Sequence, residues 1–119
     1  MKTFRELMVW QKSLSLIKNI HQITSRIPRN EIFDMTSQMR RCAISIPCNI
    51  AEGFGRHSTR DYIRFLRISM GSIFEMITLI EISRSLELIQ ITNYDTLIDQ
   101  VNEIEKMLHG LIKSLSKTQ

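Results

Sequence analysis

The stretch Leu97–Leu115, with the sequence LIDQVNEIEKMLHGLIKSL, determines the predicted fold class. Apolar side chains recur along it at steps of 4, 3, 4, 3 and 4 residues, which places them on one face of an α-helix. We expect this helix to start at Thr92 or Asn93. Its apolar row consists of Leu97, Val101, Ile104, Leu108, Leu111 and Leu115.

A second helical pattern occupies the beginning of the chain. The capping box Thr3-x-x-Glu6 predicts its start, and Pro28 predicts its end because a residue before proline is disfavoured in a helix. Two neighbouring apolar rows follow the helical period. They are Leu7, Trp10, Leu14 and Ile17, and then Leu16, Ile20, Ile23 and Ile27.

A third pattern begins near Glu31 and has the spacing of a helix packed nearly parallel to its neighbours. Pro47 lies inside it and is predicted to kink the helix, because proline cannot donate to the carbonyl of Ala43. Gly53 and Gly55 are predicted to end the helix, since glycine enters the left-handed C-cap conformation without a steric penalty. The apolar row consists of Ile32, Met35, Met39, Cys42 and Ile46.

The pattern that begins at Ser58 or Thr59 is apolar on two sides of its helix. Asp61 in the first turn interacts favourably with the helix dipole. A helix of this kind is either central in the fold or packs one side on another subunit. The first row consists of Tyr62, Leu66, Ser69, Ile73, Met76, Ile80 and Ser83, and the second of Ile63, Met70, Phe74 and Ile77.

Four long helices with short connections predict an all-α fold, an up-and-down antiparallel four-helix bundle. The chain has 119 residues, of which 43% are hydrophobic and 24% are charged, so we expect a single domain over residues 1–119. No apolar run approaches the roughly 20 residues that cross a bilayer, and the N-terminus lacks a secretory signal. Cys42 and Cys48 have neither a redox nor a zinc spacing and should not pair with each other. These features predict a cytoplasmic protein without membrane contact.

Motifs for catalysis and cofactor binding are absent from the sequence. Glu105 and His109 come nearest to the Glu-x-x-His pair of di-iron bundles, but they are four residues apart and have no second copy. P-loop, dinucleotide, zincin and haem-attachment motifs are also missing. We therefore expect no enzymatic activity, no cofactor and no metal.

Positive charge is concentrated in the middle of the chain, which has a formal net charge of +4. Residues 35–67 contain six basic and two acidic residues, whereas residues 68–119 contain four basic and seven acidic ones. A basic surface attracts polyanions, so RNA or DNA is a candidate partner. The six candidate residues are Arg40, Arg41, Arg56, Arg60, Arg64 and Arg67.

Three of these arginines, Arg60, Arg64 and Arg67, fall on one helix face with only Asp61 nearby. Guanidinium groups suit phosphate because their planar fork binds it through two parallel hydrogen bonds. The alternative is that each arginine pairs with an acid from another helix or another subunit.

A polar stripe lies beside the apolar row of the third pattern. Ser45, Asn49 and Glu52 continue it from Arg41 to Arg56 at helical spacings. One interpretation is a hydrogen-bond network that holds the kinked end of this helix against the start of the next. The other is a groove for a ligand or a nucleic acid.

The same stretch resembles the four-helix-bundle family of proteins encoded within 23S rRNA intervening sequences, and the resemblance spans nearly the whole chain. Cys48 and Ser69 depart mildly from the residues usual in that family. The matching segments are Val9-Trp10-Gln11-Lys12, Ile27-Pro28 with Glu31, Gln38-Met39-Arg40-Arg41, Ser45-Ile46-Pro47, Asn49-Ile50-Ala51-Glu52-Gly53, Gly55-Arg56, Phe65-Leu66, Gly71-Ser72 and Gly110-Leu111-Ile112.

The resemblance implies a bundle that assembles as a ring-shaped homo-oligomer, typically a pentamer, with no established catalytic activity. Similar accessory proteins of diversity-generating retroelements engage nucleic acid and a reverse transcriptase through a basic ring surface. Our hypothesis is therefore a non-enzymatic, ring-forming protein that binds RNA or DNA through its arginines. The alternatives are an interaction scaffold whose arginines form salt bridges between subunits, and an enzyme whose site forms only between subunits.

Overall fold

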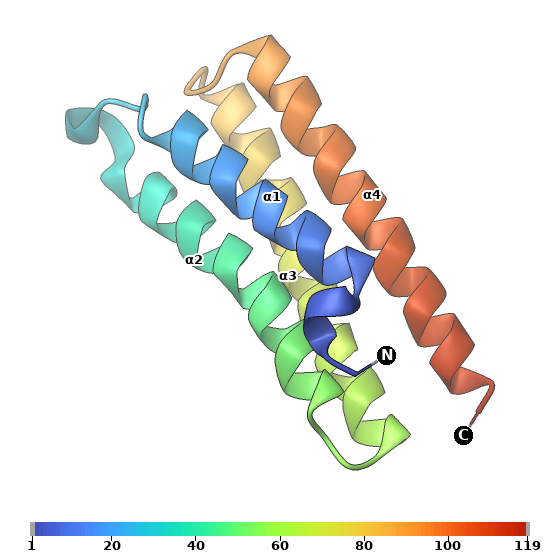
Figure 1. Cartoon of the computed structure of the whole chain (residues 1–119). Helices are drawn as coiled ribbons and strands as arrows, with labels where there is room; N and C mark the ends of the chain where they lie inside the picture. Colours follow the sequence, from blue (N-terminus) through green and yellow to red (C-terminus); the bar gives the residue numbers. More distant parts are fainter. Residues whose placement is uncertain (1, 119) are drawn as a thin grey trace.

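Four long α-helices make up the structure, a computed structural model that describes residues 2–118 and, in that range, all side chains except those of residues 29–33. A short 3-10 helix, η1 (Phe4–Glu6), precedes them. The helices are α1 (Met8–Thr24), α2 (Arg29–Phe54), α3 (Thr59–Ser85) and α4 (Ile91–Ser116) (Figure 1). No strand occurs within residues 2–118, so the predicted all-α class and the four helices are confirmed.

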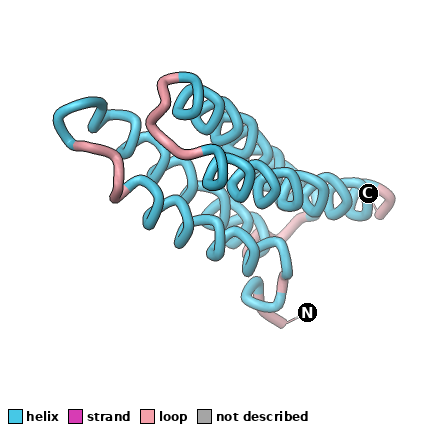
Figure 2. Tube along the Cα trace, turned by 90° about the horizontal axis from the view of Figure 1, so that it is seen from above, coloured by secondary structure: helices cyan, strands magenta, loops and turns pink. Residues whose placement is uncertain are grey.

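Each helix packs antiparallel to the preceding one, and α4 returns beside α1 to close the bundle (Figure 1). The molecule measures 48 × 20 × 20 Å, so it is a rod about one helix long. Short loops join successive helices (Figure 2). Because the helices alternate in direction, the α2–α3 turn, the start of α1 and the end of α4 lie at one end of the rod.

The core is one hydrophobic cluster to which all four helices contribute their inner rows. The predicted row of α2, the first predicted row of α3 and the row of α4 are buried along most of their length, which confirms the helical period as the signal. Ile32 is the exception that lies outside the described side chains. The second row of α3 is not buried as a whole, since only Ile63 is buried, Met70 and Ile77 are partly buried, and Phe74 is 52% exposed. Near the end of α4, Ile112 is buried and Leu111 is only partly buried. The largest fully buried side chains are Leu16, Ile20, Met39, Ile46, Ile50, Leu66, Ile73, Met76, Ile80, Leu97, Ile104 and Leu108.

The predicted start of the first helix is wrong. The Thr3 hydroxyl accepts a hydrogen bond from the Arg5 backbone N–H at 3.3 Å, but this cap belongs to η1. Leu7 then adopts an extended backbone and buries its side chain, so α1 starts only at Met8. Within α1, Leu16, Ile20 and Ile23 are buried in the core, whereas Leu14 of the other row remains 42% exposed.

The predicted role of the glycines at the end of α2 is also wrong. No described glycine has a positive φ, and Gly55 caps α2 with φ −79°. Gly53 is required for another reason, because a Cβ there would lie 2.7 Å from the Cβ of Phe65 in α3. Close approach of two helices, rather than a left-handed turn, therefore explains this glycine.

Two helices start slightly earlier than the sequence predicts. α2 begins at Arg29 after Pro28, and α4 begins at Ile91 after Gln90. The start of α3 is confirmed, since the Ser58 hydroxyl accepts a hydrogen bond from the Asp61 backbone N–H at 3.1 Å. Among the described residues, no helix is long and apolar enough to cross a membrane.

Candidate nucleic-acid interface

The basic residues of the bundle are segregated along its long axis. When each helix is divided near its midpoint, the half that contains the α2–α3 turn consists of residues 2–16, 42–72 and 104–118, which we call the basic half. It holds ten basic and four acidic residues, whereas the opposite half holds six basic and eight acidic residues. The chain is thus an electrostatic dipole with its positive end at the α2–α3 turn.

Two of the candidate arginines flank one aromatic ring. The guanidinium carbons of Arg56 and Arg64 lie 4.7 Å and 4.6 Å from the centroid of the Phe65 ring. Arg56 also pairs with Glu52 at 3.8 Å, and Arg64 with Asp61 at 3.4 Å. These ion pairs are solvent-exposed and therefore hold the side chains only weakly.

Arg60 and Arg67 differ from these two, because neither forms an ion pair with a described residue. Both are exposed on α3, about 10 Å apart along its axis. They are the arginines of the basic half whose charge the described side chains neutralise least.

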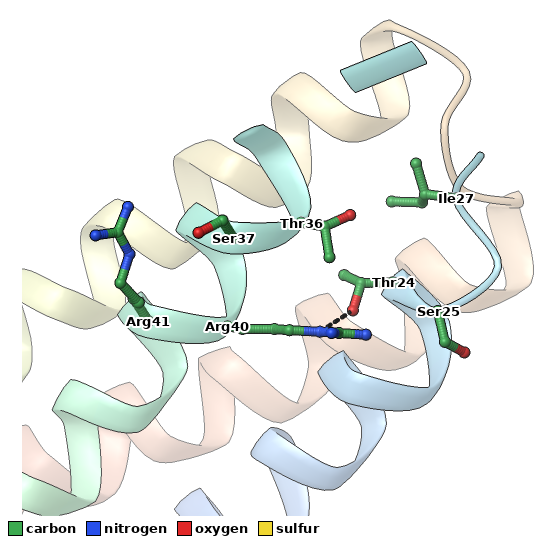
Figure 3. A pocket seen from close by; sticks show the side chains of 7 residues that line it. All are labelled: Thr24, Ser25, Ile27, Thr36, Ser37, Arg40 and Arg41. Carbon is green, nitrogen blue, oxygen red and sulfur yellow. Dashed lines mark hydrogen bonds between the residues drawn. The ribbon is translucent and has the colours of Figure 1, made fainter. Parts of the chain in front are cut away.

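Arg40 and Arg41 occupy a different part of the molecule. Arg41 is 13 residues before the end of α2 at Phe54, which corresponds to about 20 Å along the helix. Arg40 reaches across to α1, where its Nε donates to the Thr24 hydroxyl at 2.9 Å and its Nη2 donates to the His21 carbonyl at 3.3 Å. Figure 3 shows Arg40 lying toward Thr24 and Arg41 extending away from it. The structure therefore uses Arg40 to cap the C-terminus of α1.

The pocket around Arg40 has a volume of about 500 Å³ and lies between α1 and α2. It is lined by Thr24, Ser25, Ile27, Thr36, Ser37, Arg40 and Arg41 (Figure 3). Arg40 already donates two hydrogen bonds to α1, so the position of its side chain in this pocket is explained by the packing of α1 on α2.

The polar stripe of α2 forms two separate groups of interactions. Ser45 lies 2.6 Å from the hydroxyl of Ser72 in the middle of α3 and donates to the Cys42 carbonyl at 2.7 Å. Asn49 donates to the Ser45 carbonyl at 2.8 Å, whereas Glu52 forms an ion pair with Arg56. The hydrogen bonds therefore join α2 to the middle of α3, and Arg41 takes no part in them.

These bonds cluster around Pro47, which is buried while α2 continues past it. Side chains donate to the carbonyls of Cys42 and Ser45, and the hydroxyl of Ser69 on α3 donates to the carbonyl of Ile46. None of these bonds reaches the Ala43 carbonyl, which Pro47 leaves without its backbone donor, so they tie this part of α2 to itself and to α3 without replacing the lost bond.

Cys42 lies in the same region as a buried thiol 3.1 Å from the Ser72 carbonyl. Burial, together with the nearby carboxylate of Glu75, raises the pKa of Cys42 from 9.0 to about 12. Both Cys42 and Cys48 are free, as their spacing predicts. Cys42 is thus an unreactive, structural thiol.

A second concave surface lies between α3 and α4, and all of its lining residues except Phe74 belong to the basic half. It has a volume of about 520 Å³, and its lining includes Arg67 and Phe74 from α3 and His109 and Lys113 from α4. Of these four residues, only Arg67 is predicted from the sequence to be a site residue. Phe74, His109 and Lys113 become neighbours of Arg67 only through the register of α3 against α4, so no pattern in the sequence marks them as site residues. Among the described residues, no group of His, Cys, Asp and Glu side chains could hold a metal ion.

The fold and its charge distribution define a class: a small antiparallel helical-bundle protein with one strongly basic end. A family model for 23S rRNA-intervening sequence proteins matches residues 5–110, and the chain belongs to that family. No curated protein matches it significantly.

A solved structure is also similar to this chain. It is a protein with unknown function from the S23 ribosomal protein family of Bacteroides thetaiotaomicron, and it is 30% identical with a TM-score of 0.82. The match covers 89% of this chain and 99% of the other. Neither the family nor this structure indicates an enzyme.

Proposed function

We propose that the protein is a non-enzymatic, homo-oligomeric bundle that binds RNA or DNA through its basic half. The observation that carries this proposal is the separation of charge along the rod, with ten basic and four acidic residues at one end. Oriented positive charge attracts the phosphate backbone of nucleic acid and supplies most of its sequence-independent affinity.

The arginines that we assign to this interface are Arg56, Arg60, Arg64 and Arg67. Arg60 and Arg67 contribute most, because no described acid pairs with either. Arg56 and Arg64 can exchange exposed ion pairs for phosphate at little cost. Arg41 contributes long-range attraction only, and Arg40 is committed to α1.

Exposed apolar side chains on two sides of the bundle support the proposed homo-oligomer. Leu14 and Ile44 are exposed on the α1–α2 side of the bundle, and Ile68 and Ile82 are exposed on α3. Two different apolar surfaces on one chain favour a head-to-tail contact, which closes into a ring when the rotation allows it. We propose a pentamer on the basis of family resemblance. A ring repeats the basic half in every subunit, so several weak phosphate contacts act together.

We propose a cytoplasmic location, since both cysteines are free thiols of the kind that persist in a reducing compartment.

The test is nucleic-acid binding measured by fluorescence anisotropy at increasing salt, with labelled duplex DNA and RNA. We expect log affinity to fall linearly with log salt, with a slope of about 0.9 for each duplex phosphate neutralised. The double variant Arg60→Ala, Arg67→Ala removes two charges without leaving an unpaired acid and should lower both affinity and slope. The control Lys18→Ala, Arg26→Ala removes the same charge from the opposite half and should change both much less.

Two results would contradict the proposal. If the wild-type protein binds neither RNA nor DNA at low salt, the basic half does not serve nucleic acid. If the arginine variant instead dissociates into monomers, these side chains form salt bridges between subunits, and the protein is an interaction scaffold.

A further inference from the structure

The groove between α3 and α4 has a lining that combines positive charge with an exposed aromatic ring. Its volume of about 520 Å³ falls within the range of roughly 300–1,000 Å³ that small-molecule sites occupy. Arg67, His109 and Lys113 line it, and no carboxylate does. Among the described residues, none of these three side chains forms an ion pair or a hydrogen bond. The groove therefore offers several free N–H donors to an anion.

Phe74 supplies the apolar part of the groove. Its side chain is 52% exposed, although the neighbouring Ile73 is fully buried in the core. Met70 and Ile112 line the groove beside it. A phenylalanine ring that is open to solvent between cationic side chains provides a flat surface on which another ring can stack.

Gly71 adds a second, independent observation. A glycine inside a helix destabilises it relative to alanine, so such a position needs a reason. Packing gives none here, because a Cβ at residue 71 would meet no atom within 4 Å. Gly71 is itself one of the residues that line the groove, and it contributes no side chain to that position of the wall.

We propose that this groove binds a segment of single-stranded RNA or DNA, with one base stacked on Phe74 and the adjoining phosphates held by Arg67 and Lys113. The inference rests on the proposed function and narrows it to unpaired nucleic acid. An apolar ligand would leave the charges of Arg67 and Lys113 unpaired, and a simple anion would not need the ring. In a duplex the base faces are already covered by neighbouring bases. Only a single strand can therefore offer phosphates to the cationic side chains and a free base face to the Phe74 ring.

The experiment compares short fluorescent single strands of RNA and DNA with a duplex of the same length, using the full chain. Phe74→Leu keeps an apolar side chain but removes the aromatic face. We expect it to weaken single-strand binding at least about fivefold, since stacking on one aromatic side chain contributes this much or more. Duplex binding should stay within about twofold, because phosphate contacts dominate there. Phe74→Trp should retain single-strand affinity, and its added indole fluorescence should be quenched by the bound base.

Ile91→Ala is the matched control, because Ile91 is an equally exposed apolar residue at the opposite end of the bundle. It should change neither single-strand nor duplex binding. Light scattering on each variant separates effects on binding from effects on assembly.

The outcomes distinguish this inference from the proposed function. If the wild type binds single strands and duplex with a steep salt dependence, and Phe74→Leu binds both like the wild type, the groove is not the site although the basic half binds nucleic acid. If Phe74→Leu changes the oligomeric state instead, a second copy of the chain occupies the groove. If the wild type binds no nucleic acid at all, both proposals fail.

Discussion

Gly53 of α2 packs directly against the Cβ of Phe65 in α3, and a methyl group at residue 53 would lie only 2.7 Å from that atom. This contact brings the last turn of α2 onto the first turns of α3. The Phe65 ring then carries the guanidinium groups of Arg56 and Arg64 at less than 5 Å. Arg64 is next to Phe65 in α3, so the close approach at Gly53 is what brings Arg56 to the same ring.

Alanine substitutions at two glycines test this relationship. Gly53→Ala should destabilise the fold by about 1–3 kcal/mol, the usual cost of overpacking, even though alanine favours helix. Gly71→Ala is the matched control, since its Cβ would meet nothing within 4 Å and should add up to about 1 kcal/mol of stability. Urea denaturation measures both. Equal stability of the two variants would show that α3 moves away from residue 53 without cost.

The two adjacent arginines of α2 should differ in their contribution to stability. Arg40→Ala removes two hydrogen bonds to the end of α1 and should lower the free energy of unfolding by about 1–2 kcal/mol. Arg41→Ala changes the same charge on an exposed side chain and should stay within about 0.5 kcal/mol of the wild type. Thermal unfolding of both variants measures the difference. Similar losses would mean that Arg40 is as free for a ligand as Arg41.

The helical period predicts the fold of this chain because four amphipathic faces must be buried together, whatever the details of their ends. It predicts the buried Leu66, Ile73 and Leu108 correctly. It cannot decide which of two adjacent rows on α1 enters the core, since both rows follow the helical period and Leu7, the first residue of one row, lies outside the helix with an extended backbone.

The candidate site shows the same limit. The sequence identifies Arg67 by charge and spacing, but Phe74, His109 and Lys113 become neighbours only through the register of α3 against α4. Gly53 likewise resembles a helix terminator in the sequence, because a close approach between helices leaves no local pattern.

The two cysteines should react very differently with iodoacetamide. At about pH 8.5, the exposed Cys48 should be alkylated readily. Burial and Glu75 raise the pKa of Cys42 to about 12, so Cys42 should carry roughly a thousandfold less thiolate than a cysteine with the ordinary pKa. Mass spectrometry of the folded and urea-unfolded protein measures the two sites. Rapid alkylation of Cys42 in the folded protein would contradict the buried thiol.

The raised pKa also gives the stability of the wild type a pH dependence. Because the folded state favours the neutral thiol, its contribution is complete below the unfolded pKa of 9.0 and declines as the pH rises toward 12. Wild type should therefore lose stability relative to Cys42→Ala over that range. A constant difference between them would show that the thiol titrates normally.

Assembly depends on which exposed apolar side chains a second copy covers. On α2, Ser45 and Cys42 face α3 through Ser72, so Ile44 lies on the other side of the helix, toward α1. On α1, Lys12 and Asn19 face α4, so Leu14 also lies on the side toward α2. Both side chains are exposed, and we expect them to form one surface of the contact between subunits.

Charge substitution at that surface tests the ring. Wild type should elute as a multiple of 14.0 kDa in gel filtration with light scattering, five times that mass for a pentamer. Ile44→Glu would bury an unpaired carboxylate at every contact, which costs several kcal/mol and should dissociate the oligomer. Ile91→Glu is the control, because Ile91 is 50% exposed like Ile44 but lies at the start of α4. A wild-type monomer at micromolar concentration would refute the assembly. Dissociation by both variants alike would place the contact elsewhere than the α1–α2 side.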